Sequence, residues 1–204
     1  PNAPTGVALS LADVEEIVAH NREIVVIVDE AYVDFGAQSA VSLVDKYDNL
    51  LVVQTFSKSR SMAGMRIGFA IGDSKLISYL NDVKYSFNSY TMDTTALAAG
   101  VAAVKDREYF DGTCRKIIET REWTKKELKK LGFSFEDSMA NFIFASHESC
   151  PAAKLFQALR EHHIYVRYFP GKRTGNHLRI TIGTQKEMEV LTEFLRNYLN
   201  EQKI

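Results

Sequence analysis

The sequence predicts an α/β protein, and two observations favour this class. Short runs rich in valine, isoleucine and leucine alternate with segments whose apolar residues recur at helical spacing. Such alternation is typical of a mostly parallel sheet that helices cover on both sides. The chain has 204 residues, of which 46% are hydrophobic, so it can form one or two globular domains with real cores.

The first expected elements are a helix and a strand. Ser10 is an expected N-cap, and Asp13 three residues later completes something close to a capping box. The run at 23–28 is continuous and β-branched, which is typical of a strand buried on both faces. Asp29 follows it directly, at the strand end where ligands bind in open α/β sheets. The same aspartate would equally suit the cap of the next turn.

A second expected strand, at 50–54, leads into a polar loop that contains Lys58. Hydroxyls, one lysine, a glycine and an arginine after a strand end suit an anionic ligand. Taken alone, the loop fits a solvated lysine about equally well. A third strand is expected at 67–71 and a helix at about 75–84.

The second half of the chain predicts a helical link followed by a compact α+β unit. We expect two domains, at residues 1–107 and 108–204. Gly132 suits the C′ position after the second linking helix. The elements expected after residue 90 are helices at about 92–105, 108–130 and 151–162, strands at 141–145, 164–168 and 177–182, and a last helix with Met188, Leu191, Leu195, Tyr198 and Leu199 on its core face.

Composition limits the classes of partner. The net charge is −1 with acids and bases interspersed, which argues against a nucleic-acid or membrane partner. No apolar run of membrane-spanning length is present, and the N-terminus does not resemble a signal peptide. Cys114 and Cys150 are too few for a disulfide framework, so we expect free thiols in a reducing compartment. The histidines do not group as metal ligands, so no metal site is expected.

Four motifs now occur together and in order. They are PNAPTG at 1–6, VDEAYVDF at 28–35, TFSKSRSMAGMRIGFAIG at 55–72 and HLRITIGT at 177–184. The set resembles the fold-type I pyridoxal-phosphate enzymes, and specifically the histidinol-phosphate aminotransferase family of the class II aminotransferases. The resemblance runs along the whole chain. It implies a partial, mostly parallel large-domain sheet flanked by helices, and a C-terminal α+β small domain.

The resemblance implies pyridoxal 5′-phosphate as the cofactor. Lys58 matches the lysine that holds the cofactor covalently and moves protons as general acid and base. Asp29 matches the carboxylate that keeps the pyridine nitrogen protonated. Tyr32 and Asn2 match two donors to the phenolic oxygen of the ring. Without the other motifs, Asn2 would be interpreted as a simple turn asparagine.

At the cofactor phosphate, Arg66 matches the family's arginine, and Ser57 and Thr55 match its hydroxyl donors. Arg60 is either a second group beside the phosphate or a solvated surface arginine.

The substrate side requires groups that bind a carboxylate or a phosphate. Arg179 matches the family's substrate arginine in the LRIT strand, and Arg167 matches a second arginine associated with the substrate phosphate. A structural salt bridge is the alternative interpretation of Arg167.

The implied reaction is amino-group exchange between histidinol phosphate and 2-oxoglutarate, in histidine biosynthesis. An aromatic amino acid aminotransferase and a threonine-phosphate decarboxylase share the Lys58, Asp29 and Arg66 positions, so both stay open. A third alternative is an aminotransferase-like regulatory domain. The expected partners are a small-molecule amino donor and a 2-oxo acid, and a cytoplasmic homodimer is expected.

Several parts of the family's site have no counterpart in this sequence. They are the helix start that grips the phosphate, the aromatic residue that stacks on the ring, and a tyrosine from the partner subunit. The turn cluster at 1–6 is of a kind usually found between elements. We therefore expect that the sequence lacks an N-terminal portion and is nearly inactive by itself.

Overall fold

The structure is a computed structural model that describes residues 1–201 and divides into two compact units. The lysine unit is Leu9–Thr113, and the arginine unit joins Pro1–Ala8 to the chain from Cys114 onward. This division differs from the expected domains in two ways. It lies within the helix α4 (Arg107–Lys130), and the first eight residues pack with the later part of the chain. One cause is a hydrogen bond from the Met139 amide to the Gly6 carbonyl (2.9 Å).

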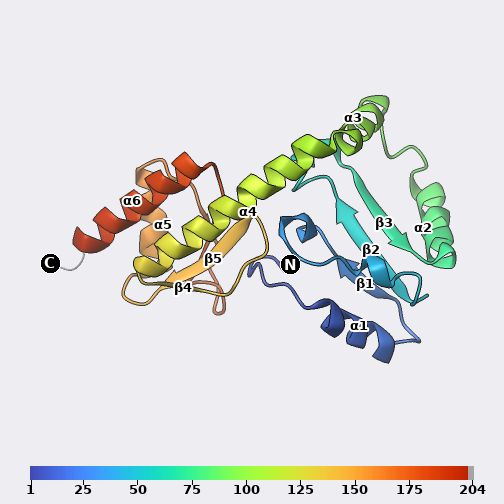
Figure 1. Cartoon of the computed structure of the whole chain (residues 1–204), viewed down its shortest axis with the longest axis horizontal. Coiled ribbons are helices and arrows are strands. Elements are labelled where there is room, and N and C mark those ends of the chain that lie inside the picture. Colours follow the sequence, from blue (N-terminus) through green and yellow to red (C-terminus); the bar gives the residue numbers. More distant parts are fainter. Residues whose placement is uncertain (202–204) are drawn as a thin grey trace. The chain divides into compact units, whose positions relative to one another are not determined.

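The lysine unit is built on a three-stranded sheet with the order β1-β2-β3 (Figure 1). The strands are β1 (Val26–Asp29), β2 (Leu50–Thr55) and β3 (Gly68–Gly72). β1 and β2 are parallel, whereas β2 and β3 are antiparallel. The α/β class is therefore confirmed, but the described sheet is mixed. β3 runs back along β2 because only a short loop with the 3₁₀ turn η3 (Ala63–Met65), and no crossover helix, connects them.

The prediction that the first strand is buried on both faces was wrong. Val26 and Val28 pack toward the core, but Ile27 between them is 63% exposed. β1 lies at the edge of the described sheet. The helix α1 (Leu11–His20) and the 3₁₀ turn η2 (Ala40–Leu43) belong to the one cluster that covers its inner face.

Helix ends in the lysine unit follow the sequence closely. The capping box at α1 is confirmed, since the Ser10 hydroxyl accepts from the Asp13 amide (3.1 Å) and the Asp13 carboxylate accepts from the Ser10 amide (3.3 Å). Asp73 caps α2 (Ser74–Phe87), and Asp93 caps α3 (Thr94–Lys105). α3 packs against the loop after β2 through a cluster of Phe56, Ile67 and Ala96.

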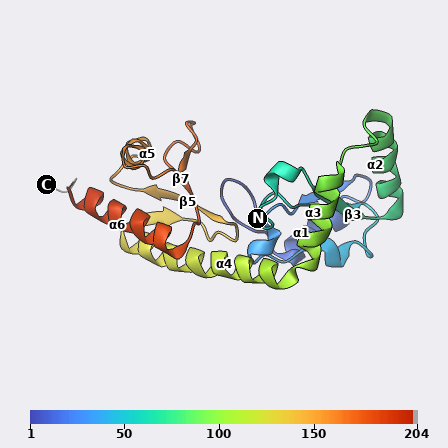
Figure 2. The same cartoon turned by 90° about the horizontal axis from the view of Figure 1, so that it is seen from above.

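The arginine unit is an antiparallel sheet with the order β4-β5-β7-β6. Its hydrophobic core includes the inner face of β7, and burial of Leu178, Ile180 and Ile182 confirms the predicted alternation. α4 and α6 lie side by side, and Arg196 contacts Glu127 between them (3.4 Å; Figure 2). The elements are β4 (Phe133–Phe135), β5 (Phe142–His147), α5 (Ala152–Glu161), β6 (Arg167–Tyr168), β7 (Leu178–Thr181) and α6 (Gln185–Glu201). The three-residue strand β4 was not predicted, because so short a segment has no detectable period.

A partly buried charge network joins α4 to the loop before β5. The Lys125 ammonium, which is buried, donates to Glu122 (2.8 Å) and Asp137 (2.7 Å). Arg121, also buried, donates to the Ala140 carbonyl (3.0 Å). These bonds fix the segment that leads into β5.

Replacing Asp137 with asparagine should make the stability of the arginine unit less dependent on pH. The hydrogen bond from Lys125 holds the pKa of the Asp137 carboxyl below its usual range. The charged pair therefore stabilises the fold above about pH 4, the usual aspartate range, and this contribution is lost as the pH falls through the lower folded-state pKa. Because Asp137 is largely exposed, we expect D137N to cost only about 0.5–1 kcal/mol at pH 7.

Urea unfolding at a series of pH values measures this effect. The neighbouring exposed residue Glu136 gives the matched control, E136Q, which should leave the unfolding free energy nearly unchanged. A D137N deficit that stays constant down to pH 2 would contradict the assignment.

Candidate active site

The sheet of the lysine unit gathers the predicted cofactor residues at one edge. Asp29 pairs with Val53 of β2, and Thr55 pairs with Gly68 of β3. Because β1 and β2 are parallel and β3 returns antiparallel, the ends of the first two strands and the start of the third share an edge. Asp29, the segment 55–58 and Arg66 therefore all lie at this edge.

Lys58 and Tyr32 are in direct contact. The Lys58 ammonium lies 5.5 Å from the centre of the Tyr32 ring, within the range of a cation–π interaction. Lys58 is exposed, and Tyr32 is half-buried at the start of the 3₁₀ turn η1 (Val33–Phe35). The two sequence segments predicted to serve one site thus meet through these side chains.

Asp29 makes the turn contact that the sequence allowed, and its role at the cofactor stays a prediction. One carboxylate oxygen accepts from the Ala31 amide (3.0 Å), as expected of a turn cap. The side chain is nevertheless exposed at the sheet edge, and a cofactor nitrogen could be reached there. The next residue, Glu30, is buried and accepts from Ser39, Ala40 and Gln54 (2.6–2.8 Å), so it stabilises the fold.

Two of the three predicted phosphate ligands, Thr55 and Ser57, form a local cluster, and Arg66 follows in the same loop. The Thr55 hydroxyl donates to the Ser57 hydroxyl (2.9 Å) and lies 3.2 Å from the Ile67 carbonyl, while the Ser57 amide donates back to Thr55 (3.1 Å). Arg66 is exposed, has a left-handed backbone with φ of 54°, and donates to the Ala63 carbonyl (2.7 Å). Hydroxyls and a guanidinium at the same sheet edge are a suitable donor set for a phosphate.

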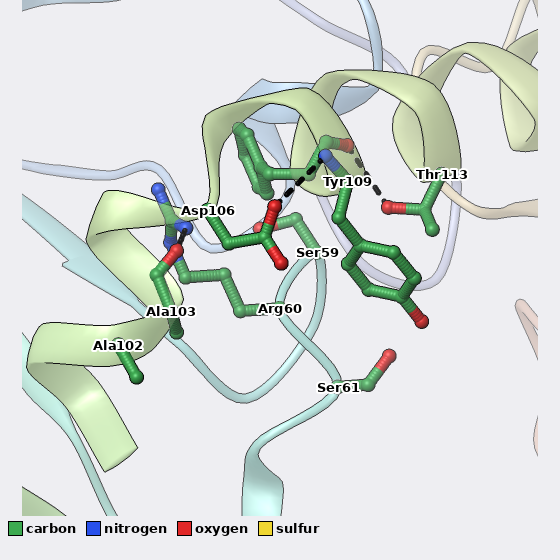
Figure 3. A pocket seen from close by; sticks show the side chains of 9 residues that line it. Ser59, Arg60, Ser61, Ala102, Ala103, Asp106, Tyr109 and Thr113 are labelled. Atoms are coloured by element: carbon green, nitrogen blue, oxygen red, sulfur yellow. Dashed lines mark hydrogen bonds between the residues drawn. The ribbon is translucent and has the colours of Figure 1, made fainter. Parts of the chain in front are cut away.

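Arg60 contacts residues outside this cluster, so the alternative of a solvated arginine was wrong, while its place beside the phosphate stays untested. Its guanidinium lies 4.0 Å from the Phe110 ring centre and 5.1 Å from that of Phe56. It also donates to the Ala103 carbonyl (2.5 Å; Figure 3). Phe110 is 50 residues away from Arg60 in the sequence, and no local pattern indicates such a contact.

Asn2 lies in a closed turn of the arginine unit. Its amide donates to the Val7 carbonyl (2.8 Å), and its carbonyl accepts from the Gly6 amide (2.7 Å). The side chain is exposed. Gly6 has φ of +79°, and a Cβ atom there would lie 2.2 Å from the Ser138 hydroxyl. Only glycine therefore fits this contact without displacement.

Gly6→Ala should therefore destabilise the arginine unit by more than about 1 kcal/mol, because a side chain is strained at positive φ and collides with Ser138. Thermal unfolding measures the loss. The matched control is Gly112→Ala in α4, where a Cβ atom would meet open space and a gain of about 0.5–1 kcal/mol is expected. Equal melting temperatures for the wild type and G6A would show that the turn is not held as described.

Arg167 and Arg179 lie directly opposite each other on β6 and β7. Both guanidinium groups lie 5.4 Å from the centre of the Phe169 ring, and Arg179 also lies 5.1 Å from that of Phe142. Within residues 1–201 neither arginine has a carboxylate partner at salt-bridge distance, so the salt-bridge interpretation of Arg167 was wrong. The Arg179 Nε is buried without a hydrogen bond.

This pair has the properties of an anion site. Like charges directly opposite on neighbouring strands destabilise a sheet. A buried N–H without a partner adds a desolvation cost. A phosphate or carboxylate between the two guanidinium groups would offset the charge repulsion and accept a hydrogen bond from the Arg179 Nε. Neither the facing charges nor the unpaired Nε could be recognised from the sequence.

The predicted residues are thus distributed over both units. The lysine unit carries Asp29, Tyr32, Thr55, Ser57, Lys58 and Arg66, and the arginine unit carries Asn2, Arg167 and Arg179. Among the described residues, no helix is long and apolar enough to cross a membrane. The same residues contain no group of three or more metal-binding side chains, and both cysteines are free and buried.

Comparison with known proteins gives consistent matches. The sequence profile of the family described as aminotransferase class I and II matches residues 1–195. The chain is 53% identical over 197 residues to a histidinol-phosphate aminotransferase of Brachyspira hyodysenteriae, covering 96% of this chain and 56% of the relative. It is 50% identical over 203 residues to one from Lactococcus lactis subsp. cremoris, covering 100% and 57%. The chain therefore spans somewhat more than half the length of these relatives.

A solved structure agrees in fold. The histidinol-phosphate aminotransferase of Clostridium acetobutylicum superposes with a TM-score of 0.90 at 24% identity, over 98% of this chain and 62% of that one. At this level of identity the likeness concerns the fold alone.

Proposed function

Because the chain belongs to the class I and II aminotransferase family, we propose that Lys58 holds pyridoxal 5′-phosphate. We propose further that the whole protein moves an amino group between histidinol phosphate and 2-oxoglutarate. The observation that carries the proposal is the gathering of Lys58, Asp29 and Arg66 at one sheet edge, with Lys58 against Tyr32. The relatives named for this reaction, at 50–53% identity, support it.

The side chains at the edge fit the chemistry of this cofactor. When bound, pyridoxal phosphate supplies an electron sink next to the reacting carbon. Lys58 provides the amine that holds it and then moves a proton to and from the substrate carbon. Asp29 keeps a proton at the ring nitrogen. Tyr32 and Asn2 donate to the phenolic oxygen.

The cofactor phosphate has its own set of donors in this proposal. Arg66 supplies positive charge, and the Ser57 and Thr55 hydroxyls supply hydrogen bonds.

The arginine pair supports a substrate with an anionic end. Planar guanidinium groups bind phosphate and carboxylate through two parallel hydrogen bonds. Arg179 has a buried N–H without a partner, and Arg167 is exposed opposite it. In this proposal the pair binds the phosphate of histidinol phosphate in one half-reaction and a carboxylate of the 2-oxo acid in the other.

Two further inferences concern the intact protein. We infer a homodimer, because the family's site takes a residue from a partner subunit. We infer a cytoplasmic location from the free, buried thiols of Cys114 and Cys150, which suit a reducing compartment.

Donor specificity tests the proposal. The whole protein, supplied with pyridoxal phosphate and 2-oxoglutarate, should form glutamate fastest with histidinol phosphate as the amino donor. Higher kcat/KM with phenylalanine or tyrosine would make it an aromatic aminotransferase. Carbon dioxide release from threonine phosphate would make it a decarboxylase. Absence of turnover with any donor, despite bound cofactor, would favour the regulatory-domain alternative.

A further inference from the structure

We propose that Arg60 is a positioning residue, which holds the lysine loop (residues 57–61) against the junction between α3 and α4 and so fixes the direction of Lys58. The inference rests on the proposed function only for the role of Lys58. The arrangement of the loop itself is independent of the cofactor.

The Arg60 guanidinium is held on three sides. It lies 4.0 Å from the Phe110 ring centre and 5.1 Å from that of Phe56, and it donates to the Ala103 carbonyl at 2.5 Å. Figure 3 shows Arg60 reaching from the lysine loop to the ribbon of the helical junction. Stacking on aromatic rings, together with a hydrogen bond, restricts the orientation of a planar guanidinium.

The acceptor is a carbonyl that the helix leaves unsatisfied. α3 ends at Lys105, so Ala103 belongs to its last turn, whose carbonyls have no partner within the helix. A cation at this end also interacts favourably with the helix dipole. Arg60 therefore supplies α3 with a hydrogen-bond donor for the Ala103 carbonyl and with a positive charge at its C-terminal end, which a solvated arginine would not.

The junction that receives Arg60 is itself held by hydrogen bonds. The Asp106 amide closes α3 on the Ala102 carbonyl (3.0 Å), and the Asp106 carboxylate accepts from the Tyr109 amide (3.2 Å) at the start of α4. Figure 3 shows Asp106 beside Tyr109. Arg60 thus joins the lysine loop to the α3–α4 junction, which Asp106 caps on both sides.

Ser59, the residue between Lys58 and Arg60, gives the loop a second anchor. Ser59 is buried and donates to the Asp34 carboxylate. Asp34 belongs to η1, which begins directly after Tyr32, the residue that Lys58 contacts. The loop then turns at Ser61, with φ of +55°, and the Met62 amide closes it on the Phe56 carbonyl (3.0 Å). The two residues after Lys58, Ser59 and Arg60, are therefore both held by side-chain hydrogen bonds.

Hydrogen exchange without cofactor tests the clamp directly. In Arg60→Met, the Ser61 and Met62 amides should exchange roughly tenfold faster, because two cation–π contacts and one hydrogen bond are lost. Arg60→Lys keeps a charge and a donor and should be intermediate. The matched control is Arg22→Met, which removes an arginine that stacks on Tyr47 (4.5 Å) away from the loop and should leave these amides unchanged.

A second readout links the clamp to Lys58. The rate at which pyridoxal phosphate, trapped with borohydride, labels Lys58 is measured against pH in the same variants. We expect a several-fold lower rate and a displaced pH profile in R60M, largely restored in R60K. A merely structural loss would lower the rate equally at every pH and would not be rescued.

The outcomes are separable. Unchanged exchange at Ser61 and Met62 in R60M overturns the positioning proposal, whatever the cofactor does. Faster exchange with an unchanged labelling profile overturns the link to Lys58. Absence of labelling in the wild type contradicts the proposed function but leaves the exchange test valid. If R60M does not fold, Phe110→Leu, which keeps Arg60 and removes one ring, is measured in its place; its Ser61 and Met62 amides must exchange faster than those of the wild type, and no increase would overturn the clamp.

Discussion

Replacing Lys58 with alanine is expected to abolish covalent attachment of pyridoxal phosphate and to lower amino transfer by roughly 10⁴-fold or more. Lys58 is the only lysine between residues 50 and 72, the segment that forms this part of the sheet edge. Its loss removes both the amine that holds the cofactor and the group that moves the proton. Visible absorption of the cofactor-loaded protein and the rate of glutamate formation measure the two effects.

Two further variants make this result specific. Lys58→Arg keeps the positive charge but offers no amine of suitable basicity, so it should be as inactive as the alanine variant. Lys75→Ala removes an exposed lysine in the first turn of α2 of the same unit and should behave like the wild type. Retention of the visible band in K58A, with its loss in K75A, would place the cofactor on Lys75 and contradict the assignment to Lys58.

Replacing Arg179 with methionine should raise the KM for histidinol phosphate by roughly 100-fold, the size expected when one partner of a partly buried charge pair is removed. Its buried Nε and its position over two phenylalanine rings indicate an anion contact at close range. Arg167→Met should have a smaller effect, because Arg167 is exposed. Steady-state kinetics with histidinol phosphate and with glutamate as donors give the KM for each donor in both variants.

Stability distinguishes this binding role from a structural one. R179M removes one of two like charges that face each other, so the melting temperature of the ligand-free protein should not fall by more than a few degrees. Arg160→Met, on the exposed side of α5, is the control and should leave KM unchanged. A normal KM with a lower melting temperature in R179M would make Arg179 a structural residue.

Local patterns predicted the elements of this fold well. The capping box at Ser10 and the alternation of Leu178, Ile180 and Ile182 were confirmed because capping and side-chain alternation are properties of short segments. Gly132 has the positive φ expected of a C′ residue. Exposure of Ile27 was not foreseen, because an apolar run does not reveal how many elements cover it.

The motif order predicted which residues meet at the sheet edge, but not how they are held. The contact of Arg60 with Phe110 and the pairing of Arg167 with Arg179 depend on tertiary packing and strand register. The sheet order β4-β5-β7-β6 depends on tertiary packing in the same way and was not predicted. The expected domain boundary at residue 107 coincides with the start of α4, whereas the compact units divide within that helix.

The most direct test of the central claim is to identify the lysine that carries the cofactor. The wild-type protein is incubated with pyridoxal phosphate, reduced with borohydride, digested and mapped by mass spectrometry. We expect one stoichiometric modification, on Lys58, in the peptide that contains Thr55 and Ser57. Modification spread over exposed lysines, or concentrated on a lysine outside residues 55–66, would contradict it.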